Sequence, residues 1–266
     1  MFHAKEYVKA ESLEQAYELN QKKGNCILGG MLWTKMQNRM IQTAIDLCDL
    51  GLNTIEETEE EFLIGAMVSM RQLETDAGLN AYTQGAVRDA VKDIVGVQFR
   101  NLATVGGSIW GRFGFSDVLT VFLAMDTEVE LFQGGRIPLK DFAEKKQDRD
   151  ILVRLIVKKT AGRFAYAAVR NQSTDFPVIA CAASCVGGEY RLAVGARPQK
   201  AMLLTVSEEQ TEEIRKNGAD AAAKIAEELA AQIPTQDNMR ASAAYRTHLA
   251  KVLIRRALLT VTEEVQ

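Results

Sequence analysis

Two of this chain's glycine pairs, each directly after an apolar segment, constrain its fold more than any other feature. Gly29 and Gly30 follow Cys-Ile-Leu (26–28), and Gly106 and Gly107 follow Leu-Ala-Thr-Val (102–105). Because glycine has no side chain, successive N–H groups at such places can form a nest for an anion such as phosphate. A glycine pair is also an ordinary turn, and neither pair fits GxGxxG or a Walker A motif. The sequence leaves phosphate binding and a simple turn open at both places.

The residues around the second pair add polar and aromatic groups. Thr104 and Ser108 could donate hydroxyl hydrogen bonds to a phosphate. Asp117 could accept hydrogen bonds from sugar or ribityl hydroxyls, or it could cap a helix that begins at Val118. The nearby aromatic residues could stack on a ligand or pack in the core: they are Trp33, Trp110, Phe113 and Phe115.

Composition limits the classes of protein that this chain can be. Its 266 residues are 47% hydrophobic, which is enough for one large domain or two modest ones. A net charge of -3 gives no basic excess for a nucleic-acid face. We expect a cytoplasmic protein without a membrane span, because the sequence shows neither a signal-peptide pattern nor a long apolar run.

Cysteine and histidine usage argues against a metal site or a disulfide framework. The four cysteines are widely spaced, and Cys181 and Cys185 would lie ~13 Å apart along a strand. We expect these two to pack in the core, where free cysteine is common. With only two histidines, a zinc site or a Ser-His-Asp triad is not expected.

The first half of the chain alternates helical and strand patterns. Ser12 and Gln15 form a capping-box pattern for a helix. Apolar segments predict strands at 26–28, 44–47, 62–70 and 127–132, with a hairpin at Gly134 and Gly135. Helical spacing predicts one helix over 81–95 and a short one over 117–125.

A second region is predicted to begin near residue 162. Strand patterns cover 163–170, 176–186 and 190–196, and the last two are joined by Gly187 and Gly188, a strong hairpin signal. Helices are predicted over 207–218, 219–233 and 242–261. This is an α+β unit in which helices back a three-stranded antiparallel sheet.

The segment RNLATVGGS…SD (100–117) resembles the RN-x-A-T-I-G-G-N/S…D signature of the FAD-binding subunits of molybdenum hydroxylases, the xanthine, carbon monoxide and nicotinate dehydrogenases among them. CILGGMLW (26–33), RIPLKDF (136–142), DILVRLIV (150–157) and MRASAAYRTHLAKVLIRRAL (239–258) extend this resemblance over nearly the whole chain. The family's Thr-Asp/Asn after the first glycine pair is Met31-Leu32 here, so two side-chain contacts are lost while the N–H donors remain.

The resemblance implies a fold and a domain division. The fold class is α+β, a two-subdomain FAD-binding fold of the PCMH/vanillyl-alcohol-oxidase type followed by a smaller α+β domain. The FAD-binding domain would span residues 1–161, with subdomains of about 1–55 and 56–161. The carbon monoxide dehydrogenase flavoprotein-like C-terminal domain would span 162–266.

The resemblance also implies positions that hold FAD. Leu28, Gly29, Gly30, Met31 and Leu32 would bind the diphosphate through backbone N–H groups, with Ile27 just before them. The other implied residues are Thr104, Gly106, Gly107 and Ser108 for the diphosphate, Asp117 for ribityl or ribose hydroxyls, with Ser116 just before it, Ile94, Phe99 and Ala103 for the adenine side, and Leu152 for the isoalloxazine ring.

The implied function is that of an oxidoreductase subunit that transfers electrons. Electrons would leave molybdopterin on a large partner subunit, pass [2Fe-2S] clusters on a small partner subunit, reach FAD here and continue to NAD or another acceptor. A xanthine dehydrogenase-like role in purine catabolism is the expected pathway. Two alternatives stay open. One is a stand-alone flavin oxidoreductase. The other is a non-catalytic assembly subunit, in which Met31 and Leu32 would explain the loss of FAD.

Overall fold

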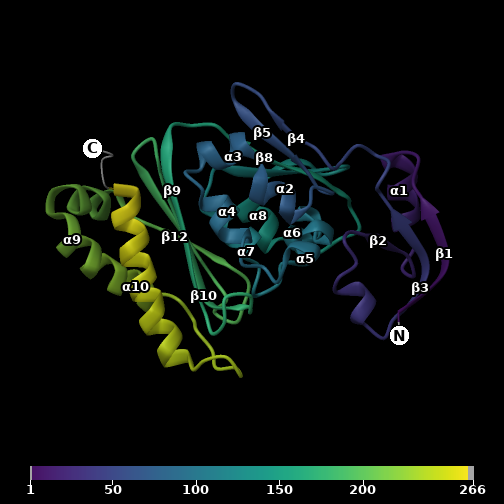
Figure 1. The fold of residues 1–266 in the computed structure, drawn as a ribbon. Helices are drawn as coiled ribbons and strands as arrows, with labels where there is room; N and C mark the ends of the chain where they lie inside the picture. The colour runs from purple at the N-terminus through teal and green to yellow at the C-terminus, as the bar shows by residue number, and fades with distance from the viewer. Residues whose placement is uncertain (1, 263–266) are drawn as a thin grey trace. The chain divides into compact units, whose positions relative to one another are not determined.

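The computed structural model describes residues 2–262, which fold into two compact units of mixed helix and sheet (Figure 1). The first unit holds the residues up to Gln72 together with Val97–Gly111 and Thr127–Lys158. The second unit holds Leu73–Gly96, Arg112–Asp126 and the residues from Lys159 on. Each unit is therefore assembled from segments that are distant in the sequence.

The first unit begins with a small parallel sheet. Its strand order is β1 (His3–Lys9), β3 (Met40–Asp46), β2 (Cys26–Leu28). The connections between these strands contain helix α1 (Leu13–Asn20) and the 3-10 helix η1 (Thr34–Met36). Gly29 and Gly30 follow β2 directly, so the first glycine pair lies at the C-terminal end of that strand.

A five-stranded antiparallel sheet forms the rest of the first unit. One face of this sheet is apolar and buried, and its side chains Phe62, Ile64 and Leu155 have no exposed surface. The strand order is β4 (Ile55–Glu57), β5 (Glu61–Gly65), β8 (Leu152–Lys158), β6 (Thr127–Leu131), β7 (Gly135–Pro138). The helices of this part are α2 (Met70–Thr75), which continues into the second unit, α5 (Val97–Leu102), α6 (Val105–Gly111) and α8 (Leu139–Glu144).

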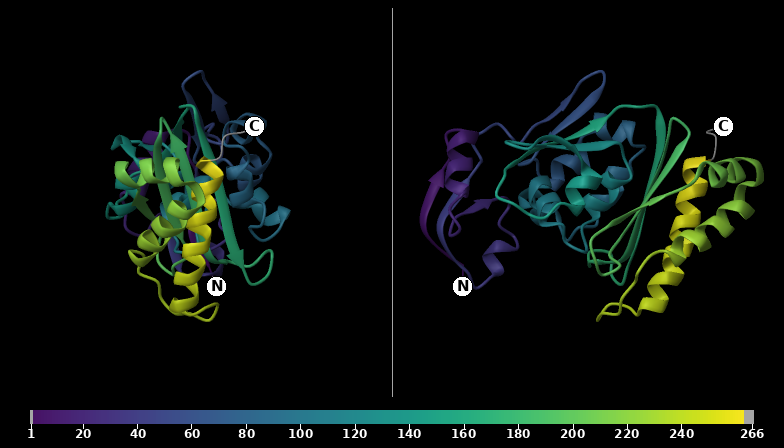
Figure 2. Two further views of the ribbon diagram at one scale, coloured as in Figure 1. Left: turned by 90° about the vertical axis from the view of Figure 1, so that its left-hand side faces the viewer. Right: turned by 180° about the vertical axis from the view of Figure 1, so that it is seen from behind.

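The second unit is an antiparallel sheet between helices, with α9 and α10 along one face (Figures 1 and 2). The strand order is β12 (Met202–Thr205), β11 (Glu189–Gly195), β10 (Pro177–Val186), β9 (Gly162–Arg170). The helices are α3 (Ala77–Tyr82), α4 (Ala86–Val91), α7 (Asp117–Leu123), α9 (Glu208–Ala231) and α10 (Ala243–Thr262).

Local sequence signals correctly located several elements. The Ser12 hydroxyl accepts a hydrogen bond from the Gln15 N–H at 3.2 Å, which begins α1. Gly187 and Gly188 turn the β10–β11 hairpin with φ of 58° and 87°, values that favour glycine. The break expected between the helices over 207–218 and 219–233 is a kink at Gly218 within α9. Cys181 is fully buried in the core between β10 and the two long helices, as expected.

Three expectations were wrong, and one strand was missed. The strand expected over 62–70 ends at Gly65, because the following residues pair with the segment before α6 instead. The helix expected over 81–95 is broken by Gln84 and Gly85, whose φ values of 47° and 82° are left-handed. The C-terminal sheet has a fourth strand, β12. Strand β1 was not expected, because it lies at a sheet edge and its side chains are mostly exposed, which removes the alternating pattern.

Arg246 connects α10 to the sheet. Its side chain is 1% exposed, and its guanidinium donates hydrogen bonds to the carbonyls of Val178 and Ala196 and to Asn238. Arg246→Leu removes these donors and leaves buried carbonyls without partners, so we expect the free energy of unfolding to fall by about 3 kcal/mol. Arg255→Leu, at an exposed position of the same helix, should change it by less than about 0.5 kcal/mol. Equal effects of the two substitutions in urea unfolding would contradict this assignment.

Candidate FAD-binding site

The two glycine pairs of the first unit lie against each other. A side-chain Cβ on Gly29 would come within 2.8 Å of the Thr104 hydroxyl oxygen and 3.7 Å of the Gly107 Cα. A Cβ on Gly30 would lie 1.8 Å from the Leu102 carbonyl oxygen, a distance that no real side chain tolerates. Glycine is therefore required here because two backbone segments touch. The structure brings together segments that are more than seventy residues apart in the sequence.

The second glycine pair is not the open turn that the sequence suggested. Gly106 and Gly107 lie in the first turn of α6, where the Thr104 hydroxyl accepts a hydrogen bond from the Gly107 N–H at 3.2 Å, as an N-cap residue does. The Gly106 N–H donates to the Ala66 carbonyl at 2.8 Å, and a Cβ on Gly106 would lie 2.7 Å from the same oxygen. Gly106 thus serves backbone packing, and its N–H is not available to an anion.

The backbone N–H donors of the first glycine turn make no hydrogen bonds within the described part of the protein. Within residues 2–262, the backbone N–H groups of Gly29, Gly30, Met31 and Leu32 have no hydrogen-bond acceptor. Met31 has a left-handed φ of 59°, a conformation that helps neighbouring N–H groups to converge. A Cβ on Gly107 would meet only the Thr104 hydroxyl, at 3.0 Å, and otherwise open space. Four unbonded donors beside an open glycine face fit the diphosphate of a dinucleotide.

The other site residues of the first unit line the same region or the nearby core. Ala103 is 6% exposed, and its Cα would lie 3.1 Å from a Cβ on Gly30. Phe99 is half-buried on α5, and its carbonyl accepts from the Ala103 N–H at 2.8 Å. Leu152, 5% exposed, is the first residue of β8. Ile27 is half-buried in β2 and packs against the core that includes Ala16 and Ile45.

Ile94, Ser116 and Asp117 belong to the second unit. The Ser116 hydroxyl accepts from the Leu119 N–H at 3.0 Å, so Ser116, and not Asp117, caps α7. Asp117 is 4% exposed, and one carboxylate oxygen pairs with the Arg170 guanidinium at 2.9 Å while the other accepts from the Tyr166 hydroxyl. Its carboxylate is therefore held within the protein.

The charges of this Asp117 cluster (Asp117, Tyr166 and Arg170) interact strongly. Burial raises the pKa of Asp117, while the Arg170 cation and the Tyr166 hydrogen bond oppose that rise. Burial, together with the Asp117 charge, holds the pKa of Tyr166 well above its usual range. Arg170 also donates to the Asp175 carbonyl at 2.7 Å, so it fixes the end of β9 to the loop that follows. The cluster therefore joins α7 to β9.

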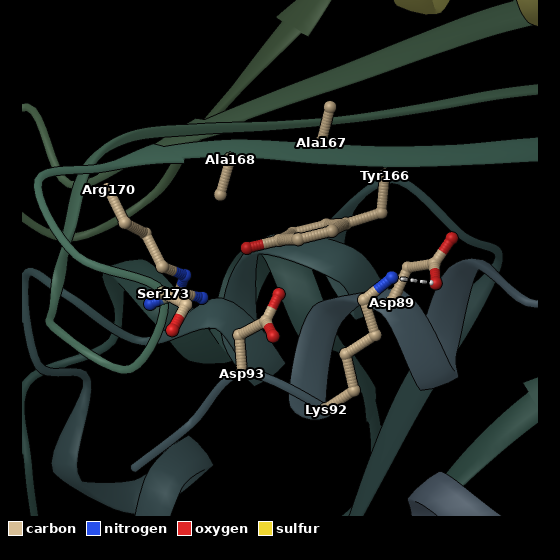
Figure 3. Close-up of a pocket in the computed structure, with 8 residues that line it drawn as sticks. All are labelled: Asp89, Lys92, Asp93, Tyr166, Ala167, Ala168, Arg170 and Ser173. Carbon is tan, nitrogen blue, oxygen red and sulfur yellow. Dashed lines mark hydrogen bonds and ion pairs between the residues drawn. The ribbon is translucent and has the colours of Figure 1, made fainter.

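A cavity of about 320 Å³ lies beside this cluster, within the second unit. Figure 3 shows the Asp93 carboxylate pointing toward Tyr166, with the ion pair of Lys92 and Asp89 at 2.8 Å on one side. The lining residues are Asp89, Lys92, Asp93, Tyr166, Ala167, Ala168, Arg170 and Ser173. The sequence did not single out Tyr166 or Arg170. Their spacing could have indicated that they lie together, because residues four apart on a strand share a face.

Comparisons with known proteins match this architecture. Residues 2–161 match the FAD binding domain in molybdopterin dehydrogenase, and residues 164–261 match the CO dehydrogenase flavoprotein C-terminal domain. The chain belongs to the family of FAD-binding subunits of the molybdenum hydroxylases, and its cofactor is FAD. The family and the fold class expected from the sequence are confirmed.

Individual relatives resemble the chain over nearly its full length. The uncharacterized protein YgfM of Escherichia coli (strain K12) is 27% identical and covers 94% of this chain and 93% of its own. The chain provisionally named xanthine dehydrogenase FAD-binding subunit XdhB, from the same organism, is 25% identical. The match covers 97% of this chain and 96% of that relative. Among solved structures, reconstituted CO dehydrogenase from Oligotropha carboxidovorans has a TM-score of 0.81 at 22% identity, over 98% of this chain and 96% of that one.

The buried phenol of Tyr166 should make the free energy of unfolding depend on pH in the alkaline range. Its pKa in the folded state lies well above its unfolded value near 10, so the folded protein keeps a proton that the unfolded chain loses. This contribution to the free energy of unfolding is present below about pH 10 and is lost as the pH rises. We expect urea unfolding of Tyr166→Phe to show a smaller decline between about pH 9 and about pH 11 than the wild type. Tyr245→Phe, at a 48% exposed position, is the control and should follow the wild type; equal slopes for all three proteins would refute the assignment.

Proposed function

We propose that this chain is the FAD-carrying electron-transfer subunit of a molybdenum-dependent dehydrogenase. It would accept electrons from iron–sulfur clusters on a small partner subunit, downstream of molybdopterin on a large one, and deliver them to NAD or another acceptor. The observation that carries this proposal is the set of four unbonded N–H groups of Gly29–Leu32 beside the open face of Gly107. Successive backbone N–H groups of this kind form concavities that bind anions.

The proposed roles of the residues follow from this geometry. The N–H groups of the first glycine turn donate to the diphosphate, and Gly107 lets it approach because no side chain stands there. Thr104 keeps the first turn of α6 in place through its bond to the Gly107 N–H. Bound FAD supplies two-electron redox chemistry, and the protein supplies orientation and electrostatic environment. Phe99 and Ala103 are proposed for the adenine side, and Leu152 for the ring.

The side chains of residues 31 and 32 and the contacts of Asp117 narrow the proposed roles further. Met31 and Leu32 offer no side-chain donors, so binding of the diphosphate depends on backbone groups, at about 1 kcal/mol for each side-chain hydrogen bond that is missing. The Asp117 carboxylate already accepts from Arg170 and Tyr166, so a role for it as the polyol ligand is not part of the proposal. The same Met31 and Leu32 favour one alternative, an assembly subunit that has lost FAD.

The proposed pathway is oxidation of a purine or another N-heterocycle. The relative provisionally named as a xanthine dehydrogenase subunit supports this, because it matches the chain from end to end. The hydroxylated substrate would bind on the partner that holds molybdopterin, so residues of this chain would not select it.

FAD binding by the purified chain tests the proposal. We expect a yellow protein with the absorption bands of an oxidised flavin, or a colourless one that takes up added FAD. Gly107→Val places methyl groups on the open face, so we expect FAD to bind at least about tenfold more weakly while Tm changes by less than about 2 °C.

Gly30→Ala is the matched control for that experiment. Its Cβ would collide with the Leu102 carbonyl, so it should lower Tm as well as FAD binding. A wild-type chain that neither contains nor takes up FAD would support the assembly alternative. A Gly107→Val variant that binds FAD as tightly as the wild type would show that the diphosphate lies elsewhere.

A further inference from the structure

Residues 33–40, directly after the Gly29–Leu32 turn, present large apolar side chains that are not buried. They include Trp33, Met36 and Met40, and none of the eight side chains is buried. Met36 is 66% exposed and Met40 is 63% exposed. Single exposed apolar residues are ordinary, but several large ones within one short segment indicate a contact surface. We call residues 33–40 the methionine segment.

The neighbouring sheet extends this surface. Strands β1 and β3 pair in parallel, with His3 opposite Met40 and Tyr7 opposite Ala44. Paired residues share a face and positions four apart return to it, so the Tyr7 and Met40 side chains lie on the same face. The Tyr7 side chain is 59% exposed. Methionine and aromatic residues are enriched at the centres of protein interfaces, which fits a docking role.

Positive charges outnumber acids near the methionine segment. Residues 19–45 contain four cations, Lys22, Lys23, Lys35 and Arg39, and no acid, in a chain whose net charge is -3. The next residue, Asp46, is an acid whose carboxylate accepts from the Tyr7 hydroxyl at 2.6 Å. Arg149 adds a cation to this edge, because its guanidinium donates to the carbonyls of Lys22 and Lys23 at 3.0 Å each. Burial raises the pKa of the Cys26 thiol in β2, and the charges of Arg39 and Arg149 oppose that rise.

We propose that the methionine segment is the docking site for an acidic iron–sulfur protein that delivers electrons to this chain. The inference rests on the proposed function. An acidic rim complements the cations, and small, salt-dependent contacts are typical of electron-transfer partners. The segment continues directly from the Gly29–Leu32 turn, so a partner docked there contacts the part of the chain that holds the diphosphate. A second copy of this chain fits less well, because a two-fold contact through this face would oppose like charges.

Two double substitutions separate the charged and apolar parts of this surface. Lys35→Glu with Arg39→Glu reverses the charge, and Met36→Asp with Met40→Asp breaks the apolar centre. The controls are Lys140→Glu, at an exposed position of α8, and Met239→Asp, at a 92% exposed position in the second unit. None of these residues belongs to the proposed FAD site.

The experiment isolates the complex of the tagged full-length chain from its native cells, identifies its iron–sulfur chain by iron content and absorbance, and measures binding of that purified chain to each variant. We expect charge reversal to weaken binding at least tenfold at about 50 mM salt and by less at about 300 mM, where charges are screened. The double substitution of Met36 and Met40 should weaken binding at least tenfold at both salt concentrations, and the two control variants should bind as the wild type does. FAD content and Tm should be unchanged in every variant.

Three results would overturn the inference. The first is wild-type binding of the iron–sulfur chain by both double variants, which leaves the proposed function intact. The second is recovery of a wild-type chain that holds FAD without any iron–sulfur chain, which would also remove the electron donor of the proposed function and favour a stand-alone flavin oxidoreductase. The third is that the isolated chain sediments as a dimer and that Met36→Asp with Met40→Asp abolishes this dimer. That result would make a second copy of the chain the occupant. A chain without FAD would instead refute the proposed function itself.

Discussion

The contact between the Gly29–Gly30 turn and the backbone of residues 102–104 holds the first unit's site together. It brings the end of the parallel sheet against the start of α6, and it tolerates no side chain at Gly30. The same segment is tied to the larger sheet, because the Val105 N–H donates to the Val68 carbonyl at 2.8 Å and the Ala66 N–H donates to the Val153 carbonyl at 2.9 Å. Both sheets of the first unit therefore fix the position of one turn whose N–H groups remain unbonded.

The glycines of this site divide into two kinds. Gly29, Gly30 and Gly106 lack side chains because protein atoms occupy the space, whereas Gly107 faces open space apart from one hydroxyl. Steric need within the protein explains the first three, and the approach of a ligand best explains the fourth. The second unit uses charge for a different purpose: Asp117, Tyr166 and Arg170 join α7 to β9, and the adjoining cavity is lined by both acids and bases. Family membership makes FAD the cofactor, and the backbone geometry indicates where its diphosphate fits.

Sequence reasoning succeeded where the cause is local and failed where it is not. A capping hydroxyl such as Ser12 and a hairpin glycine such as Gly188 act on the residues next to them, so their effects can be recognised in the sequence. The ion pair of Asp117 with Arg170 joins residues 53 apart, and strand spacing puts Tyr166 and Arg170 on one face without identifying Asp117 as their partner. The N–H of Gly106 is bonded to Ala66, forty residues away, which the glycine pair alone could not reveal. Strand β1 was missed because its exposed edge position gives no alternation.

The central claim is that one diphosphate is held by the backbone of Gly29–Leu32 beside Gly107. Amide hydrogen–deuterium exchange of the full chain with and without FAD tests it most directly, because an N–H that donates to phosphate exchanges slowly. We predict strong protection of the amides of residues 29–32 on addition of FAD, with Gly106 unchanged because its N–H is already bonded. Protection that appears only elsewhere, with the amides of residues 29–32 exchanging as fast as in the free protein, would contradict this account.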